Sequence, residues 1–195
     1  MKKKKMTIGK PTYAIVNMVA SANLELDLDL YSIAYKVHDV EYEPEQFPGA
    51  ILKLKQPKSS LLLFKNGKII CTGCRSEREV QEAIDKTQKM LLNFTKSKAK
   101  RGKPAFTVEN IVASASMNVE LDLYSIAYKV QEVEYEPEQF PGAIFKLKQP
   151  KSSLLLFKNG KIICTGCKSE KEVIEALAQT AKIMAPYASP LVKKQ

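Results

Sequence analysis

The sequence predicts an α+β fold built from two similar halves, each with helices on one face of a mainly antiparallel sheet. Three observations predict it: an internal repeat, short segments in which apolar residues alternate, and longer segments in which they recur at helical spacing. Residues 31–80 match residues 124–173 at a constant offset of 93, without a gap. Only five of those fifty positions differ, so both halves should adopt the same fold.

The repeat also sets the expected domain boundaries. Two copies of so long a period indicate two halves of a pseudo-symmetric unit, because a solenoid needs at least three shorter repeats. A stretch rich in Lys, Ser and Gly lies between the copies and is typical of a linker. We expect a basic N-terminal tail over residues 1–12, a first repeat over 13–92, a basic linker over 93–105, a second repeat over 106–185 and a C-terminal tail over 186–195.

Each half is predicted to follow the order β-α-β-β-β-β-α. Strands are expected where apolar and β-branched residues cluster, helices where an N-cap precedes apolar residues at helical spacing, and loops at Pro and Gly. The alternating leucines of 24–30 would also suit a strand, so the start of the first helix stays open. In the first half the expected elements include strands at 13–21, 50–55, 59–64 and 68–72, helices that begin after Asp29 and Ser76, and a loop at 43–49.

Both faces of the predicted sheet are apolar. Alternation places Leu62 and Phe64 on one face and Leu61 and Leu63 on the other. The helices of each half suffice to cover only one face. The other face is either buried by oligomerisation or left free for a ligand that is flat and partly apolar, and the pattern alone leaves both readings open.

Charge and composition narrow the class of protein. The 31 Lys and Arg residues outnumber the 21 Asp and Glu residues, and the net charge of +10 favours a polyanionic partner. No apolar run approaches the roughly 20 residues of a membrane span, and no signal peptide is evident. We therefore expect a soluble, cytoplasmic protein. No residue pattern typical of an enzyme occurs: the one histidine, His38, is replaced by Gln131 in the other copy.

Two duplicated motifs carry a family resemblance. Glu-Pro-Glu-Gln-Phe-Pro-Gly occurs at 43–49 and 136–142, and Gly-Lys-Ile-Ile-Cys-Thr-Gly at 67–73 and 160–166. These motifs resemble the TATA-binding protein family, and the first resembles its archaeal branch. The resemblance covers residues 13–92 and 106–185.

The resemblance implies a fold, a function and partners. The fold would be a pseudo-two-fold saddle, a curved antiparallel sheet with helices on its convex face. The function would be that of a general transcription factor, without enzymatic activity or cofactor, that binds the TATA box in the DNA minor groove, bends it by phenylalanine wedging, and recruits transcription factor B and RNA polymerase. Its partners would be A·T-rich promoter DNA, factor B and, through factor B, the polymerase. The protein would then be associated with the nucleoid, or nuclear in a eukaryote.

The resemblance also assigns roles to residues. Phenylalanines would insert between base steps, asparagines would reach the A N3 and T O2 acceptors, an apolar and hydroxyl floor would exclude the guanine amino group, and lysines would lie near phosphates. The implied DNA-binding residues are Asn17, Val19, Ser21, Phe47, Lys53, Lys58, Leu62, Phe64, Lys68, Ile70 and Thr72 in the first repeat, and Asn110, Val112, Ser114, Phe140, Lys146, Lys151, Leu155, Phe157, Lys161, Ile163 and Thr165 in the second.

The register of one hairpin is not decided by the residues. A two-residue Asn66-Gly67 turn would put Ile69 and Cys71 on the face of Phe64. A three-residue loop with a bulge would bring Ile70 and Thr72 there instead. The second arrangement is adopted on the resemblance.

The acidic loops and the cysteines are the remaining candidates. In the family, the acidic loop of the second half contacts factor B, so Glu136 and Glu138 are partner-binding candidates, and the identical 43–45 segment offers a second docking loop. The Cys-x-x-Cys pairs at 71–74 and 164–167 are read as structural residues of the helix-covered face. Zinc or redox chemistry is the alternative, but the pairs are 90 residues apart, unlike a compact zinc module.

Two alternative classes of function and one consequence of symmetry also follow from the sequence. The alternative classes are a nucleic-acid-binding module that does not act at promoters and a zinc or redox protein. All groove-facing positions named above are identical between the copies, which predicts little preference between the two directions along DNA. The Lys2–Lys5 run and the linker are expected either to add salt-sensitive affinity for DNA or to act as solubilising segments.

Overall fold

The structure is a computed structural model that describes residues 8–95 and 103–191. The chain forms two compact units, Val16–Asn110 and a second that joins Met1–Ile15 to Ile111–Gln195. Each unit contains most of one sequence repeat. The basic run at the N-terminus and most of the linker, to which the sequence assigns DNA affinity or solubility, lie outside the described residues.

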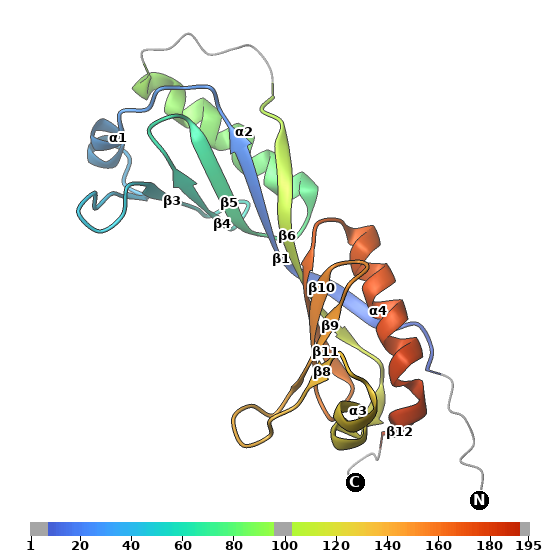
Figure 1. The fold of residues 1–195 in the computed structure, drawn as a ribbon. Helices are drawn as coiled ribbons and strands as arrows, with labels where there is room; N and C mark the ends of the chain where they lie inside the picture. The colour runs from blue at the N-terminus through green and yellow to red at the C-terminus, as the bar shows by residue number, and fades with distance from the viewer. Residues whose placement is uncertain (1–7, 96–102, 192–195) are drawn as a thin grey trace, which may run out of the picture. The chain divides into compact units, whose positions relative to one another are not determined.

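The first unit has the predicted element order. Strands β2, β3, β4, β5 and β1 are hydrogen-bonded in that order, and every pair is antiparallel. Helix α2 packs against β5 and covers one face of the strands (Figure 1). The elements are β1 (Thr12–Asn23), α1 (Leu30–Lys36), β2 (Val40–Glu41), β3 (Ala50–Leu54), β4 (Ser59–Leu63), β5 (Lys68–Cys74), α2 (Glu77–Leu91) and the short 3₁₀ helix η1 (Leu92–Phe94).

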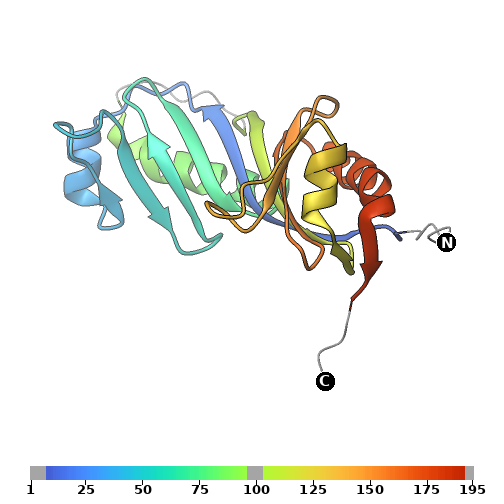
Figure 2. The ribbon, with the colours of Figure 1, turned by 60° about the horizontal axis from the view of Figure 1, so that its bottom comes forward.

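The second unit repeats this arrangement with two added strands. Strands β8, β9, β10, β11 and β6 are neighbours in that order, and α4 packs on β11 (Figure 2). The additional strands β7 and β12 pair with each other. The elements are β6 (Phe106–Ser116), β7 (Val119–Leu121), α3 (Leu123–Lys129), β8 (Val133–Glu134), β9 (Ala143–Leu147), β10 (Ser152–Leu156), β11 (Lys161–Cys167), α4 (Glu170–Met184), η2 (Ala185–Tyr187) and β12 (Ala188–Pro190).

The two repeats differ in the leucine-rich segment that the sequence leaves open. In the second repeat this segment forms β7, and residues assigned to the C-terminal tail form its partner β12. In the first repeat the corresponding residues make one isolated bridge, between Leu28 and Thr95. Glu25 and Asn118, at matching positions, have φ of 55° and 53° and break the regular strand geometry at this point. In the second repeat, where Met117 and Val119 stand in place of Leu24 and Leu26, this segment is a regular strand because β12 pairs with it.

Helix starts follow the predicted caps. The Asp29 carboxylate accepts from Ser32 N at 3.1 Å, and Asp122 accepts from Ser125 N at the same distance. At the second helix, Ser76 Oγ accepts from Glu79 N at 3.2 Å. The stripe that the spacing predicts for this helix is the buried one: Val80, Ala83, Ile84, Thr87 and Leu91.

Only one face of the strands is buried within each unit. Leu61 and Leu63 are fully buried on the face that the helix covers, and the side chain of Cys71 is buried with them. Leu62 and Ile70, on the other face, are only half-buried. This answers, for each unit taken alone, the question that the sequence leaves open: the helices cover one apolar face and the other remains accessible.

The hairpin between β4 and β5 has the three-residue loop. Leu62 pairs with Ile70, Phe64 N donates to Lys68 O at 3.0 Å, and Gly67 N donates to Phe64 O at 2.9 Å. Gly67 has φ +77°, and a Cβ there would lie 2.4 Å from Leu26 O, so a side chain is excluded. The register adopted on the resemblance is confirmed.

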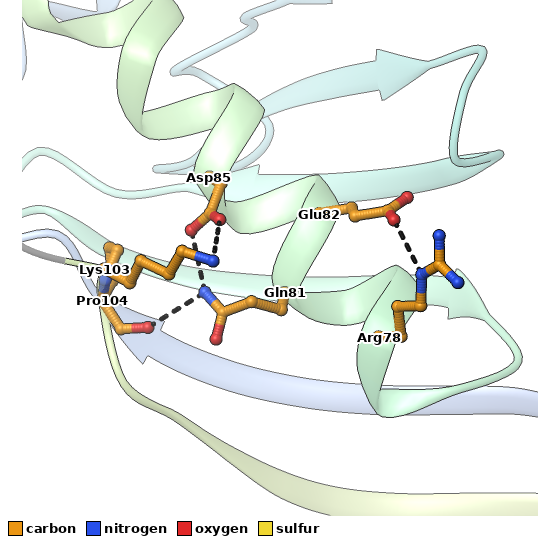
Figure 3. Close-up of polar contacts among 6 residues, drawn as sticks. All are labelled: Arg78, Gln81, Glu82, Asp85, Lys103 and Pro104. Atoms are coloured by element: carbon orange, nitrogen blue, oxygen red, sulfur yellow. Dashed lines mark hydrogen bonds and ion pairs between the residues drawn. The ribbon is translucent and has the colours of Figure 1, made fainter.

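The end of the linker is held on α2 (Figure 3). Lys103 Nζ lies 3.6 Å from Asp85 Oδ2, and Gln81 Nε2 donates to Asp85 Oδ1 at 2.8 Å and to Pro104 O at 3.4 Å. The end of the linker therefore contacts α2, on the side of the sheet opposite Leu62 and Ile70. None of the helices within residues 8–95 and 103–191 is long and apolar enough to cross a membrane.

Phe145 offers a test of how well the two cores correspond. It is buried in β9 at the position that Leu52 occupies, also fully buried, in β3. We expect Phe145→Ala to lower the free energy of unfolding by about 3–5 kcal/mol. Phe145→Leu should cost about 1 kcal/mol, because the first repeat packs a leucine in the same surroundings. Urea unfolding followed by circular dichroism measures both, and equal losses for the two variants would contradict the correspondence.

Candidate nucleic-acid interface

A row of four half-buried side chains crosses the accessible face of each repeat. Strand pairing places Ser21 beside Ile70, Ile70 beside Leu62, and Leu62 beside Ile51. Residues directly opposite each other in antiparallel strands point to the same side of a sheet. We call this the outer row; it consists of Ser21, Ile70, Leu62 and Ile51 in the first repeat and of Ser114, Ile163, Leu155 and Ile144 in the second.

The outer row of the first repeat borders a hollow. The hollow has a volume of 780 Å³, and Ser21, Phe64, Lys68, Ile70 and Thr107 are among the residues that line it. Its wall is therefore apolar along the strands and basic at the hairpin. Such a surface suits a ligand with an apolar body and negative charge at its edge.

A pair of phenylalanines stands at the loop end of each repeat. The ring centroids of Phe47 and Phe64 are 6.0 Å apart with the planes at 64°, and Phe140 and Phe157 repeat this geometry. A Cβ at Gly49 would lie 2.7 Å from the Phe47 ring and 3.2 Å from the Phe64 ring. Glycine is therefore what lets the two rings meet. Phe47 and Phe140 remain 40% and 39% exposed, which is unusual for so large an apolar side chain.

Two hydrogen bonds orient the side-chain amide of Asn17. Its Oδ1 accepts from Gly73 N at 2.8 Å and from Thr72 Oγ1 at 3.3 Å. A backbone N–H can only donate, so the oxygen of the amide must face it and the NH₂ group points elsewhere. The contact lies at the irregularity between Met18 and Ala20, where the pairing of β1 with β5 shifts. The matching Asn110 is half-buried, as Asn17 is.

The six candidate lysines fall into two groups. Lys53 Nζ lies 2.6 Å from Glu41 Oε1, and Lys146 Nζ lies 2.8 Å from Glu134 Oε1, so both are ion-paired to the short edge strand of their repeat. The other four are exposed and make no ion pair with another residue of 8–95 or 103–191. These are Lys58, Lys68, Lys151 and Lys161. The hairpin lysines are thus the more accessible positive charges.

The acidic loops are exposed in both repeats. Glu43 and Glu45 precede Phe47, whose backbone N donates to Glu43 O at 3.0 Å and closes a tight turn. Glu136 and Glu138 occupy the same positions before Phe140, which makes the matching bond to Glu136 O at 3.0 Å. The turn that presents the phenylalanine therefore also presents the two carboxylates to solvent.

The structure adds residues that the sequence alone did not indicate. Ile51 and Ile144 complete the outer row, and alternation on either side of the buried Leu52 would have indicated them. Ser60 pairs with Thr72, between Thr72 and Lys53, on the same face. Glu109 accepts a hydrogen bond from Ser21 Oγ at 2.7 Å. No sequence signal indicates the contact between Ser21 and Glu109. The repeat does not reveal it either, because Val16 stands at the position that matches Glu109.

Comparisons with known proteins agree with this geometry. The family model described as transcription factor TFIID, or TATA-binding protein, matches residues 12–94 and 105–187. The chain belongs to this family. Among its relatives, the TATA-box-binding protein of Pyrobaculum islandicum is 41% identical over 172 residues, which cover 88% of this chain and 85% of that one. That of Pyrodictium occultum is 44% identical over 169 residues, 86% of this chain and 83% of the other.

A solved structure shares the fold. The Methanococcus jannaschii TATA-binding protein has a TM-score of 0.81 and 39% identity, with 88% of this chain and 97% of that chain covered. The expected α+β fold of two repeats is thereby confirmed. Membership of a family of transcription factors also agrees with the expectation that the chain is not an enzyme.

The four cysteines lie inside the family fold rather than on its accessible face. Cys71 Sγ is 3.7 Å from Cys74 Sγ, and Cys164 Sγ is 3.9 Å from Cys167 Sγ, and all four side chains are buried. Burial raises the pKa of Cys164 to about 12. The hydrogen bond with Cys74 and burial both raise the pKa of Cys71. As neutral thiols, Cys71 and Cys164 act as small apolar groups of the core. All four cysteine side chains lie in the core, as the sequence predicts.

The raised thiol pKa predicts a loss of stability at high pH. An unfolded cysteine has a pKa of about 8.5, so above that pH the unfolded chain releases a proton that folded Cys164 retains. The free energy of unfolding should then fall, by up to about 1.4 kcal/mol per pH unit for each such thiol. Urea unfolding between pH 7 and pH 10 should show a shallower decline for Cys164→Ala than for the unchanged protein. Parallel declines would contradict the assignment.

Proposed function

We propose that the chain is a general transcription factor that binds the TATA box promoter element in the DNA minor groove, bends it by phenylalanine wedging, and recruits transcription factor B and RNA polymerase. The observation that carries the proposal is the outer row with its phenylalanine pair, one ring of which is exposed, present once in each repeat. The names of the relatives, TATA-box-binding proteins, support it. The protein would act where promoter DNA is, in the cytoplasmic nucleoid or, in a eukaryote, the nucleus.

Donors and apolar groups on this face suit A·T pairs. In the minor groove A·T and T·A pairs present only the A N3 and T O2 acceptors, whereas guanine adds an amino donor. The NH₂ group of Asn17 supplies a donor, since its oxygen is already engaged. Leu62 and Ile70 offer no acceptor to a guanine amino group. The proposed base-contacting residues are the asparagines, serines, threonines and apolar residues of the set given above.

The phenylalanine pairs suit wedging. Insertion of an apolar side chain between base steps unstacks them and kinks the duplex, and the bend lets DNA cover more of the protein. Phe47 and Phe64 pack edge to face in the space that Gly49 leaves, so the rings are ordered before DNA arrives. Preorganised rings lose little conformational entropy on insertion.

Basic side chains supply the part of the DNA affinity that does not depend on the base sequence. Lys58, Lys68, Lys151 and Lys161 are available to phosphates, and each neutralised phosphate releases counterions. Lys53 and Lys146 must first exchange their glutamate partners for phosphates. These two are therefore expected to contribute less to the salt dependence of binding than the other four.

Phenylalanine substitution tests wedging and groove binding together. In a native gel-shift assay, the affinity of the protein for an A·T-rich duplex should be at least tenfold higher than its affinity for a G·C-rich duplex of equal length. Phe47→Ala with Phe64→Ala should lower the affinity for the A·T-rich duplex by at least tenfold and reduce its bend, because the wedge of one end is gone. Circular permutation of the site in the duplex measures the bend.

The identical repeat provides the control for this test. Phe140→Ala with Phe157→Ala should cause a similar loss, since the two pairs have the same geometry. Tyr35→Ala, which alters a 90% exposed aromatic residue of α1, should change neither affinity nor bend. Unchanged affinity and bend in both double variants would refute the wedge assignment.

The acidic loops test partner recruitment. Glu136→Gln with Glu138→Gln should weaken formation of the complex with factor B on promoter DNA by at least tenfold, because exposed carboxylates that pair with a partner's cations are lost. Binding to DNA alone should persist. Glu43→Gln with Glu45→Gln changes an identical loop in the first repeat and is the matched control. If both variants recruit factor B as well as the unchanged protein does, the second-repeat loop is not its docking site.

A further inference from the structure

One contact makes the outer rows of the two repeats chemically different. Ser21 Oγ donates to Glu109 Oε1 at 2.7 Å, and both residues belong to the unit Val16–Asn110. The repeat offset places Val16 at the position that matches Glu109, and Ser114 at the position that matches Ser21. A valine has no polar group, so this hydrogen bond has no counterpart in the other repeat.

The contact sets the polarity of Ser21. A hydroxyl has one proton to donate, and an ionised carboxylate can only accept. With its proton directed to Glu109, Ser21 presents only lone pairs to a ligand. The Ser114 side chain makes no hydrogen bond with another residue of 8–95 or 103–191, so its proton is free to turn toward a ligand. Identical serines therefore differ in hydrogen-bonding character: Ser114 can donate or accept, whereas Ser21 can only accept.

Ser21 is placed where its polarity matters to a ligand. It pairs with Ile70 in the outer row and lines the 780 Å³ hollow together with Phe64 and Ile70. The exposed carboxylate of Glu109 adds negative charge beside it. An acceptor at this position repels the A N3 and T O2 acceptors and suits the amino donor of guanine.

We propose that Glu109 makes the first-repeat half of the outer row tolerant of a G·C pair, while the second-repeat half remains selective for A·T, so that the protein alone orients itself on a site with one G·C-containing end. This inference rests on the proposed minor-groove binding. It revises the expectation, drawn from identical residues, that the two directions along DNA are nearly equivalent. The carboxylate acts through the serine, and its role is to position a proton.

Orientation is measured by directed cleavage of DNA. An iron chelate coupled to Lys65→Cys, a residue that borders the hollow, marks the first-repeat end, since the four native cysteines are buried. On an A·T duplex with a single G·C pair at one end, cleavage should favour the flank next to that pair by about fivefold, the equivalent of roughly one hydrogen bond. On the all-A·T duplex the bias should be absent.

Substitutions test whether the polarity of Ser21 causes the cleavage bias. Glu109→Val, which copies Val16, should abolish the bias while affinity for the all-A·T duplex stays the same or rises. Ser21→Ala should also abolish the bias, because the acceptor that favours the G·C pair is lost. Glu109→Gln should keep the bias, because the amide oxygen still accepts the serine proton. Persistence of the bias in Glu109→Val or in Ser21→Ala overturns the proposal.

The outcomes also separate this inference from the function on which it rests. If the unchanged protein does not prefer the all-A·T duplex to a G·C-rich one, the proposed function fails. If it prefers A·T but cleaves both flanks of the single-G·C duplex equally, only the inference about Glu109 fails. Thermal unfolding of each variant by circular dichroism shows that a lost bias does not reflect a lost fold.

Discussion

The pairing of Leu62 with Ile70 fixes which side chains of each repeat face outward. A three-residue loop closed by Gly67, at φ +77°, sets this register. Because side chains alternate along a strand, a shift of one residue would turn Ile69 and Cys71 outward and bury Ile70 in the helix-covered core. The buried thiols, the packing of the helices and the composition of the outer row all depend on this one loop.

Burial on one side only is the second constraint, and it follows from how little helix each repeat has. Each long helix buries a single stripe, and that stripe covers the face that holds Leu61 and Leu63. The opposite apolar face stays accessible in each unit, where most proteins would cover it. Gly49 leaves room for the rings of Phe47 and Phe64 to meet at the edge of that face, and the Phe47 ring stays exposed there. An apolar face left accessible in this way does not stabilise the fold, but it is available to bind a ligand.

The sequence predicts the repeat, the element order, the helix caps and the buried helix stripe, because each depends on neighbours within a few residues. It does not decide the hairpin register, since Asn66-Gly67 suits two loop lengths, and a family resemblance was needed. It cannot give the pairing of β7 with β12, because most of the second repeat separates these two strands along the chain. The alternation of side chains around Leu52 could have predicted the outward position of Ile51. It could not predict the hydrogen bond from Ser21 to Glu109, which joins residues 88 positions apart.

Duplicated residues do not guarantee duplicated chemistry. A hydroxyl or an amide reads a ligand through whichever of its donor and acceptor sites the protein leaves free, and its neighbours decide which those are. Asn17 becomes a donor because Gly73 occupies its oxygen, and Ser21 becomes an acceptor because Glu109 takes its proton. The first of these neighbours is identical in the other repeat and the second is not. The symmetry of the proposed DNA-binding face is therefore set also by residues that contact it, such as Glu109, where the two copies have diverged.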